Sequence, residues 1–368
     1  HLSVQNFGAI TSTLGPAIIA ESGASTDVTN YIGGTIGGIS VSLGSVSNGG
    51  LIDGGNLSAI DSGAFSIISN TGIIRSSSNS ATILLGNNGS IGNNGAIENT
   101  GMGPTITATG PLWVYNYTNG SISAQGGTAI TTSGSLILSN QGSISGAIDA
   151  HLATINATID TTGGMINGDI RLGSGDDLLA GGLLDITSGT FTNITGVVDG
   201  GAGLDTVKVS LASSGTLDAV ALPTNFEKMQ LALVNEAAIT LGSGLDLSNG
   251  ISVGGSGSII NDRDIASTGS AISTYFSYPA VLSISNSGNI QATLASGTDF
   301  ALNLGMITSG DNSGTITATG GGGLSASILT YGTTAFTNSG TITADGPGVI
   351  ISGKFDNQGT VRSTGDVG

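Results

Sequence analysis

A short motif, Asn-x-Gly-x-Ile or Asn-x-Gly-x-Val, recurs along this 368-residue chain. An apolar residue stands two positions before the asparagine in most copies, so apolar and polar residues alternate as they do in a β-strand. Neighbouring copies are often 22 to 26 residues apart, and a degenerate copy at Asn261 precedes Asn286 by 25. The motif asparagines are Asn6, Asn48, Asn70, Asn87, Asn93, Asn140, Asn286, Asn303, Asn312, Asn338 and Asn357.

A repeat of this length, with short strands, Gly and Asn turns and no helix-period stretch, predicts an all-β solenoid, a right-handed parallel β-helix. At roughly 20–26 residues a coil, the chain would form about 16 coils that contact chiefly their neighbours. Ile, Val, Leu and Phe are expected to line the interior. The motif asparagines are expected to form turns and to stack into an amide ladder, and the motif glycines are expected to adopt a positive φ.

Composition excludes several functional classes. With 7 Lys and Arg against 24 Asp and Glu, the net charge is −17, and such a surface repels nucleic acid. The chain has no Cys, so disulfides and thiolate metal sites are excluded. No stretch approaches the roughly 18 uninterrupted apolar residues of a membrane helix. The first residues, HLSVQNFGAI, lack the blocks of a signal peptide, so any targeting segment is expected to lie outside this sequence.

We expect one domain over residues 1–368, with regular coils at 1–145 and 251–368 and an irregular middle at 146–250. Two acidic turns stand in that middle, and GGAGLDTVK matches the calcium-binding repeat GGxGxDxUx of secreted toxins. Its nearest analogue, LGSGDDLLA, is imperfect, so no tandem array exists. The two interpretations are a calcium site at Asp177 and Asp205, the one metal or cofactor expected, and plain Gly-Asp turns.

The segment LPTNFEKMQLALVNEAAITLGSG follows the second acidic turn. Together with coils such as FTNSGTITA, it resembles the passenger domains of bacterial autotransporters, the type V secreted proteins of Gram-negative bacteria. The resemblance implies a virulence-associated passenger at the cell surface or in the extracellular space that is not itself embedded in the outer membrane. It also implies a C-terminal β-barrel, which this sequence lacks and which is expected outside it.

No catalytic residues are expected, and a non-enzymatic role is favoured. A serine nucleophile needs a base, yet the chain has only His1 and His151 and no Gly-x-Ser-x-Gly elbow. The enzymatic alternative is a lyase or hydrolase acting on acidic polysaccharides through Asp176, Asp177 and Asp205, which rests on fold analogy alone.

Aromatic residues are rare, and two clusters of them stand out. One cluster is Trp113, Tyr115 and Tyr117, which alternate and therefore share one strand face; the other is Tyr275, Phe276 and Tyr278 in the loop STYFSYP. If external, the rings form a platform for sugars or proteins; if internal, they stack inside the helix. External placement of the first cluster is favoured because Val114 would then point into the core.

The leading hypothesis is a surface-exposed or secreted β-helical passenger that mediates adhesion, aggregation or biofilm contact. Its expected partners are host or bacterial cell-surface glycans or proteins, with self-association as a further expectation. Besides the enzymatic alternative, a third interpretation is a passive stalk that presents another domain.

Overall fold

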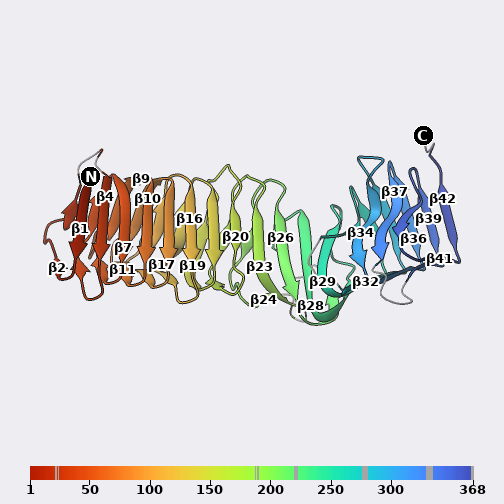
Figure 1. Ribbon diagram of the computed structural model, residues 1–368, viewed down its shortest axis with the longest axis horizontal. Coiled ribbons are helices and arrows are strands. Elements are labelled where there is room, and N and C mark those ends of the chain that lie inside the picture. The colour runs from red at the N-terminus through yellow and green to blue at the C-terminus, as the bar shows by residue number, and fades with distance from the viewer. Residues whose placement is uncertain are drawn as a thin grey trace. The chain divides into compact units, whose positions relative to one another are not determined.

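The computed structural model describes residues 1–365 except 21–22, 24, 187, 189, 219–222, 276–280 and 329–334. The described residues form short strands and no helix, and the strands build a parallel β-solenoid of about 15 turns (Figure 1). The prediction of an all-β parallel solenoid is therefore confirmed. By internal contacts the chain forms two compact units. Unit 1 comprises His1–Gly182, Asn193–Thr206 and Pro223–Phe226, and unit 2 comprises Leu183–Thr192, Val207–Leu222 and Glu227–Gly368.

In unit 1, two walls of parallel strands run through successive coils. The first wall is β1 (Leu2–Asn6), β4 (Ser25–Asn30), β7 (Leu43–Asn48), β10 (Ser66–Asn70), β13 (Gly89–Asn93), β16 (Leu112–Asn116), β18 (Leu136–Asn140), β20 (Thr158–Asp160) and the start of β23 (Leu178–Asp185). The second is β2 (Ala9–Ile10), β5 (Thr35–Ile36), β8 (Leu51–Asp53), β11 (Ile73–Ser76), β14 (Ala96–Asn99), β17 (Ser121–Thr132), β19 (Ser143–Asp149), β21 (Met165–Asn167), β22 (Ile170–Arg171) and β25 (Val198–Asp199). A third row joins the second wall at β17 and consists of β3 (Ile18–Ile19), β6 (Ile39–Val41), β9 (Ile60–Ala64), β12 (Ile83–Asn87) and β15 (Ile106–Ala108).

Unit 2 repeats this plan with a few longer strands, whose pairing shifts register, and a separate five-stranded sheet. Its main strands are β24 (Thr190–Phe191), β26 (Thr206–Leu211), β27 (Gly215–Leu217), β28 (Lys228–Leu241), β29 (Ile251–Asn261), β31 (Ile272–Thr274), β32 (Val281–Asn286), β34 (Phe300–Ile307), β35 (Ser309–Asn312), β37 (Gly322–Ile328), β38 (Phe336–Asn338), β40 (Val349–Ser352) and β41 (Phe355–Asn357). The five-stranded sheet is β30 (Ile265–Ser267), β33 (Asn289–Thr293), β36 (Thr315–Thr319), β39 (Thr341–Ala344) and β42 (Thr360–Ser363).

The interior consists of aliphatic columns, because each inward residue pairs in register with an equivalent residue one coil away. In unit 1 these columns are Val28, Val46, Ile68, Ile91, Val114 and Leu138; Ile36, Ile52, Ile74, Ile97, Ile122 and Ile144; and Ile39, Ile60, Ile83, Ile106, Ile130 and Ile148. All of these side chains are buried. Their mutual contacts provide the apolar burial that a charge-poor chain needs for stability.

The repeated asparagines form amide ladders, as expected from the sequence, and every ladder asparagine except the terminal Asn357 is buried. In unit 1 each Nδ2 donates to the Oδ1 of the next ladder asparagine at 2.8 Å, and in unit 2 at 2.7 Å. The unit 1 ladder is Asn6, Asn30, Asn48, Asn70, Asn93, Asn116 and Asn140, and the unit 2 ladder is Asn261, Asn286, Asn312, Asn338 and Asn357. Each of these side-chain hydrogen bonds joins one coil to the next at the same corner.

Apart from the degenerate copy at Asn261, ladder membership differs from the motif in four places. Asn30 and Asn116 belong to the ladder although they lack the motif, because two extra residues enlarge their turns and Nδ2 donates to Gly34 O and Gly120 O instead. Asn87 and Asn303 fit the motif but are exposed on other strands. Position in the coil, more than the local motif, therefore decides which asparagine is buried.

The predicted positive φ at the motif glycines is wrong. Gly72, Gly95 and Gly314 are not among the residues with positive φ. Glycine is required there because the backbone of the preceding coil lies very close. A Cβ on Gly72 would lie 2.1 Å from the carbonyl oxygen of Gly50, and a Cβ on Gly314 would lie 2.0 Å from the carbonyl oxygen of Gly288. No side chain fits where equivalent turns stack at this corner.

Candidate functional site

The aromatic residues of β16 lie on the outside of the wall. Val114 is fully buried, whereas Tyr115 and Tyr117 are 39% and 49% exposed and Trp113 is half-buried. The alternation of the strand therefore places Trp113 and Tyr115 outward, and Tyr117 follows in the adjoining turn. The structure brings these three predicted recognition residues together on one face of unit 1.

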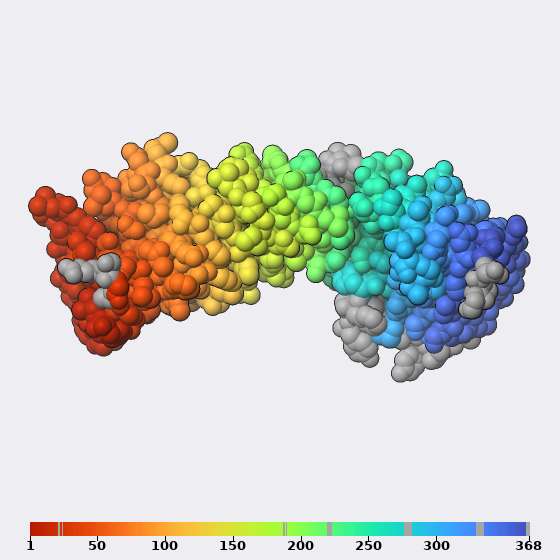
Figure 2. Space-filling model, turned by 90° about the horizontal axis from the view of Figure 1, so that it is seen from above, coloured from red at the N-terminus to blue at the C-terminus, as the bar shows by residue number. Residues whose placement is uncertain are grey.

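The rings are flanked in the neighbouring coils by small residues and by Ile137, which pairs with Trp113 and is 39% exposed. Trp113 pairs with Ser90 in the preceding coil, and Tyr115 pairs with Gly92 and Ser139. A Cβ on Gly92 would lie 3.6 Å from Cε2 of Tyr117, so the Tyr117 ring lies against the strand where Gly92 has no side chain. Successive coils lie side by side in chain order within the unit, so their outward side chains form a continuous surface (Figure 2).

The second aromatic cluster is described only at Tyr275, which belongs to unit 2. Its ring lies over Gly254, where a Cβ would be 2.8 Å from Cζ, and its hydroxyl donates to Leu231 O at 3.2 Å. Burial raises the pKa of this hydroxyl. Tyr275 is thus held against the wall, while Phe276 and Tyr278 lie outside the described residues and their recognition role stays a prediction.

The two acidic turns stack in unit 1 with their carboxylates directed at backbone amides. Asp177 and Asp205 are 2% and 0% exposed. Asp177 Oδ1 accepts the Ala157 N–H at 2.6 Å, and Asp205 Oδ1 accepts the Asp177 N–H at 2.6 Å. Asp176 is exposed, and its Oδ1 accepts the Leu204 N–H at 3.0 Å. These carboxylates tie each turn to the next.

The predicted calcium site would draw on the same carboxylates. Calcium takes six to eight oxygen ligands, yet Asp177 and Asp205 each already direct one oxygen at a backbone N–H. Asp177 Oδ2 is buried without a hydrogen-bond partner. Within the described part of the chain, no three or more His, Asp or Glu side chains are grouped to hold a metal. Calcium at Asp177 and Asp205 stays a prediction, which thermal unfolding with and without calcium would test.

Burial of Asp177 makes stability depend on pH. Burial raises the pKa of this carboxyl above its ordinary value, against the lowering effect of backbone hydrogen bonds. The folded state therefore holds the proton more tightly, and the resulting stabilisation is present below the unfolded-state pKa and lost as pH rises through the folded-state pKa. We expect urea unfolding between pH 4 and 7 to show a smaller loss of stability in Asp177→Asn than in wild type. The exposed control Asp61→Asn should follow wild type; identical profiles for Asp177→Asn and wild type would contradict this account.

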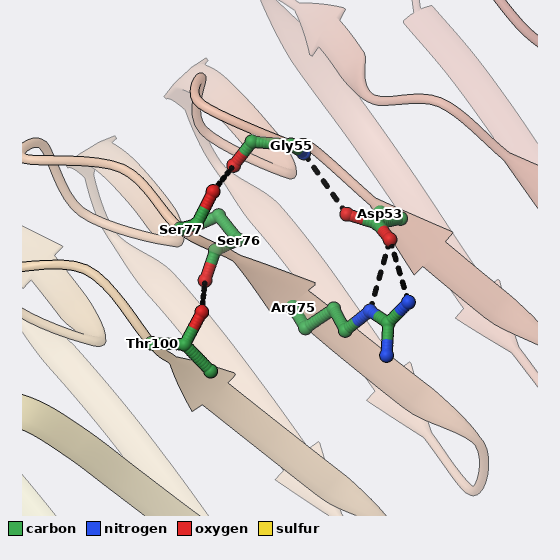
Figure 3. Close-up of polar contacts among 6 residues, drawn as sticks. All are labelled: Asp53, Gly55, Arg75, Ser76, Ser77 and Thr100. Atoms are coloured by element: carbon green, nitrogen blue, oxygen red, sulfur yellow. Dashed lines mark hydrogen bonds and ion pairs between the residues drawn. The ribbon is translucent and has the colours of Figure 1, made fainter.

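A groove that the sequence analysis missed lies over the early coils of unit 1. Its charged row is Asp53, Arg75 and Glu98, which pair in register on β8, β11 and β14. Arg75 donates from Nε to Asp53 Oδ2 at 2.9 Å, and a terminal guanidinium nitrogen lies at the same distance from that oxygen (Figure 3). Ser77 and Thr100 hydroxyls line the same groove, which has a volume of about 300 Å³.

A sequence signal for this row existed. Asp53, Arg75 and Glu98 each lie five residues after a motif asparagine, namely Asn48, Asn70 and Asn93. Equivalent positions in consecutive coils become neighbours in a solenoid. Aligning the copies on their asparagines would therefore have placed these charges side by side.

No family model, curated protein or solved structure matches this chain. The described residues include no helix of the length and apolarity that a membrane span requires.

Proposed function

We propose that this protein is a surface-exposed or secreted, non-enzymatic recognition protein, the passenger of a Gram-negative autotransporter that mediates adhesion, aggregation or biofilm contact. The observation that supports this proposal is the outward face formed by Trp113, Tyr115 and Tyr117. Buried columns and ladders account for the repeat itself, so recognition is assigned to side chains that point outward.

The aromatic face suits a glycan or protein partner. Tyr and Trp combine a large apolar surface with a polar group, and such residues are enriched where partners bind. The flanking Ser90, Gly92 and Ser139 are too small to cover the rings, and the partly exposed Ile137 adds apolar surface beside Trp113. A partner can therefore reach the rings without rearrangement of the wall.

The five-stranded sheet of unit 2 supports self-association. Its strands contain no carboxylate, although the chain has a net charge of −17. Thr315, Thr317 and Thr319 are exposed on β36, and Thr341 and Thr343 stand in register beside the first two on β39. Like-charge repulsion between two copies is weakest at such a surface.

The geometry disfavours the polysaccharide-cleaving alternative. Asp177 and Asp205 are buried, and of the three carboxylates in that hypothesis only Asp176 is exposed. A general acid or base must come within hydrogen-bond reach of the bond that it cleaves. Two carboxylates enclosed in the wall do not meet that requirement in this conformation.

Alanine substitution in the aromatic face tests the proposal. Trp113→Ala and Tyr117→Ala should each weaken binding to cells or immobilised glycans by about tenfold, which is the usual effect of losing an interface aromatic. Far-ultraviolet circular dichroism should be unchanged, because both rings are outside the core. Leu152→Ala, another exposed apolar residue of unit 1, is the matched control and should bind as wild type. Full binding by both aromatic variants would remove this face from the account, and no binding by wild type would favour the passive stalk.

A further inference from the structure

We propose that the groove of unit 1 is a second binding site, which takes a neutral, hydroxyl-rich oligosaccharide. The site uses Asp53, Arg75, Glu98, Ser77 and Thr100. This proposal goes beyond the aromatic face, because it specifies a class of ligand and the site contains none of the aromatic residues.

The Arg75 guanidinium is held in place by contacts within the protein. Asp53 Oδ2 accepts a hydrogen bond from the Arg75 Nε–H at 2.9 Å. Asp53 Oδ1 accepts one from the Gly55 N–H at 2.9 Å, so the turn fixes the carboxylate in place (Figure 3). The Arg75 side chain is nevertheless 45% exposed. Its remaining N–H groups are available to a ligand oxygen at little cost in ordering.

Glu98 places an acceptor beside this donor. It stands opposite Arg75 in the next coil, at a strand spacing of roughly 4.8 Å, and lines the same groove. Its carboxylate has no hydrogen bond or ion pair to any described residue. Adjacent hydroxyls of a sugar ring match this arrangement, since one hydroxyl donates to Glu98 while its neighbour accepts from Arg75.

Two protein hydroxyls extend the polar surface. Ser77 Oγ donates to Gly55 O at 3.0 Å, and Thr100 Oγ1 donates to Ser76 O at 3.2 Å (Figure 3). Because each hydroxyl has one proton and uses it on the wall, its oxygen faces the groove as an acceptor. Acceptors thus outnumber donors, which suits a ligand rich in O–H groups.

The charge of the groove selects against acidic glycans. Asp53 and Glu98 carry two negative charges and Arg75 one positive charge, in a chain whose net charge is −17. A uronate or sialate carboxylate would add a further negative charge to this environment. A neutral sugar forms the same hydrogen bonds without that repulsion.

A second hollow of about 560 Å³ lies on the other side of the turn that carries Asp53 and Gly55, and these two residues line both. Leu14 and Leu57 line this second hollow, and Leu14 is 97% exposed. Apolar side chains of this kind contact the C–H faces of sugars. An oligosaccharide that extends over this turn would meet hydroxyl recognition at Arg75 and Glu98 on one side and apolar contact at the leucines on the other.

Titration of purified protein with neutral hexose oligosaccharides of four to six units, by calorimetry and by ligand-observed NMR, tests this site. Polygalacturonate fragments of equal length are the charged comparison. We expect a neutral series to bind, acidic fragments to bind at least about tenfold more weakly, and Glu98→Gln and Arg75→Gln to lose about tenfold or more of the neutral affinity.

The control is Arg171→Gln, which breaks a comparable surface pair with Asp169 at 3.0 Å and should leave binding unchanged. Thermal unfolding should show that all variants fold, since exposed ion pairs contribute only about 0–1 kcal/mol to stability. The proposal is overturned if no neutral oligosaccharide binds, if acidic fragments bind more tightly, or if Glu98→Gln binds as wild type. Trp113→Ala should retain binding of the short neutral oligosaccharides used in this titration, even where it weakens binding to cells, so failure of the aromatic face and failure of the groove are distinguishable.

Discussion

Asn93→Ala is expected to lower the free energy of unfolding by about 3–5 kcal/mol, since each buried polar group left unpaired costs about 1–3 kcal/mol. The Asn93 side chain is fully buried and donates to Asn116 Oδ1 at 2.8 Å and to Ser121 O at 3.1 Å. Asn93 Oδ1 also accepts a hydrogen bond from Asn70 Nδ2 at 2.8 Å. Alanine removes these three bonds and also the two that the side chain makes with the backbone of Gly95, and it interrupts the ladder in the middle of unit 1. Urea unfolding followed by circular dichroism measures the effect.

Asn87→Ala is the matched control, because Asn87 has the same motif but is exposed on β12. It should change stability by less than about 0.5 kcal/mol, as most surface substitutions do. Equal effects of the two substitutions would show that the ladder contributes nothing beyond the motif's turn.

Gly314→Ala is expected to destabilise unit 2 by about 2–3 kcal/mol, the scale of an overpacked site that cannot relax. The new Cβ would stand 2.0 Å from Gly288 O and 2.7 Å from Ser287 C, both backbone atoms of the preceding coil. The coils must separate to admit it, which strains the bond between Asn286 and Asn312. Thermal unfolding of the purified variant measures the loss.

Gly269→Ala provides the comparison within the same unit. A Cβ at Gly269 would meet nothing within 4 Å, and its φ is not positive. This variant should unfold at or slightly above the wild-type temperature, because alanine lowers the entropy of the unfolded chain. A large loss at Gly269 and none at Gly314 would contradict the close-approach explanation.

Much of the architecture was predictable because every coil of a solenoid repeats the same pattern of strands, turns and inward-facing residues. Alternation around Asn70 and Asn93 predicted the strands, and their spacing predicted the parallel stacking. The role of Gly72 was not predictable from local sequence, since a positive φ and a close backbone approach both require glycine. Asn30 and Asn116 were missed because a two-residue insertion hides an equivalent position.

The candidate sites, too, were predictable from the sequence only in part. Outward placement of Trp113 followed from strand alternation and the inward direction of Val114. The burial of Asp177 and Asp205 did not follow, because a Gly-Asp turn reads as exposed until the next coil covers it. The row of Asp53, Arg75 and Glu98 depends on alignment between coils, so no single segment reveals it.

The claim that buried amide ladders hold the coils in register is tested most directly by hydrogen exchange of asparagine side-chain amides. Protein labelled with ¹⁵N at asparagine would be transferred to D₂O and followed by NMR. The Nδ2 protons of Asn93 and Asn116 should persist long after those of exposed Asn87 have exchanged, because their exchange requires opening of the coils. Exchange of the ladder amides as fast as that of Asn87 would contradict the account.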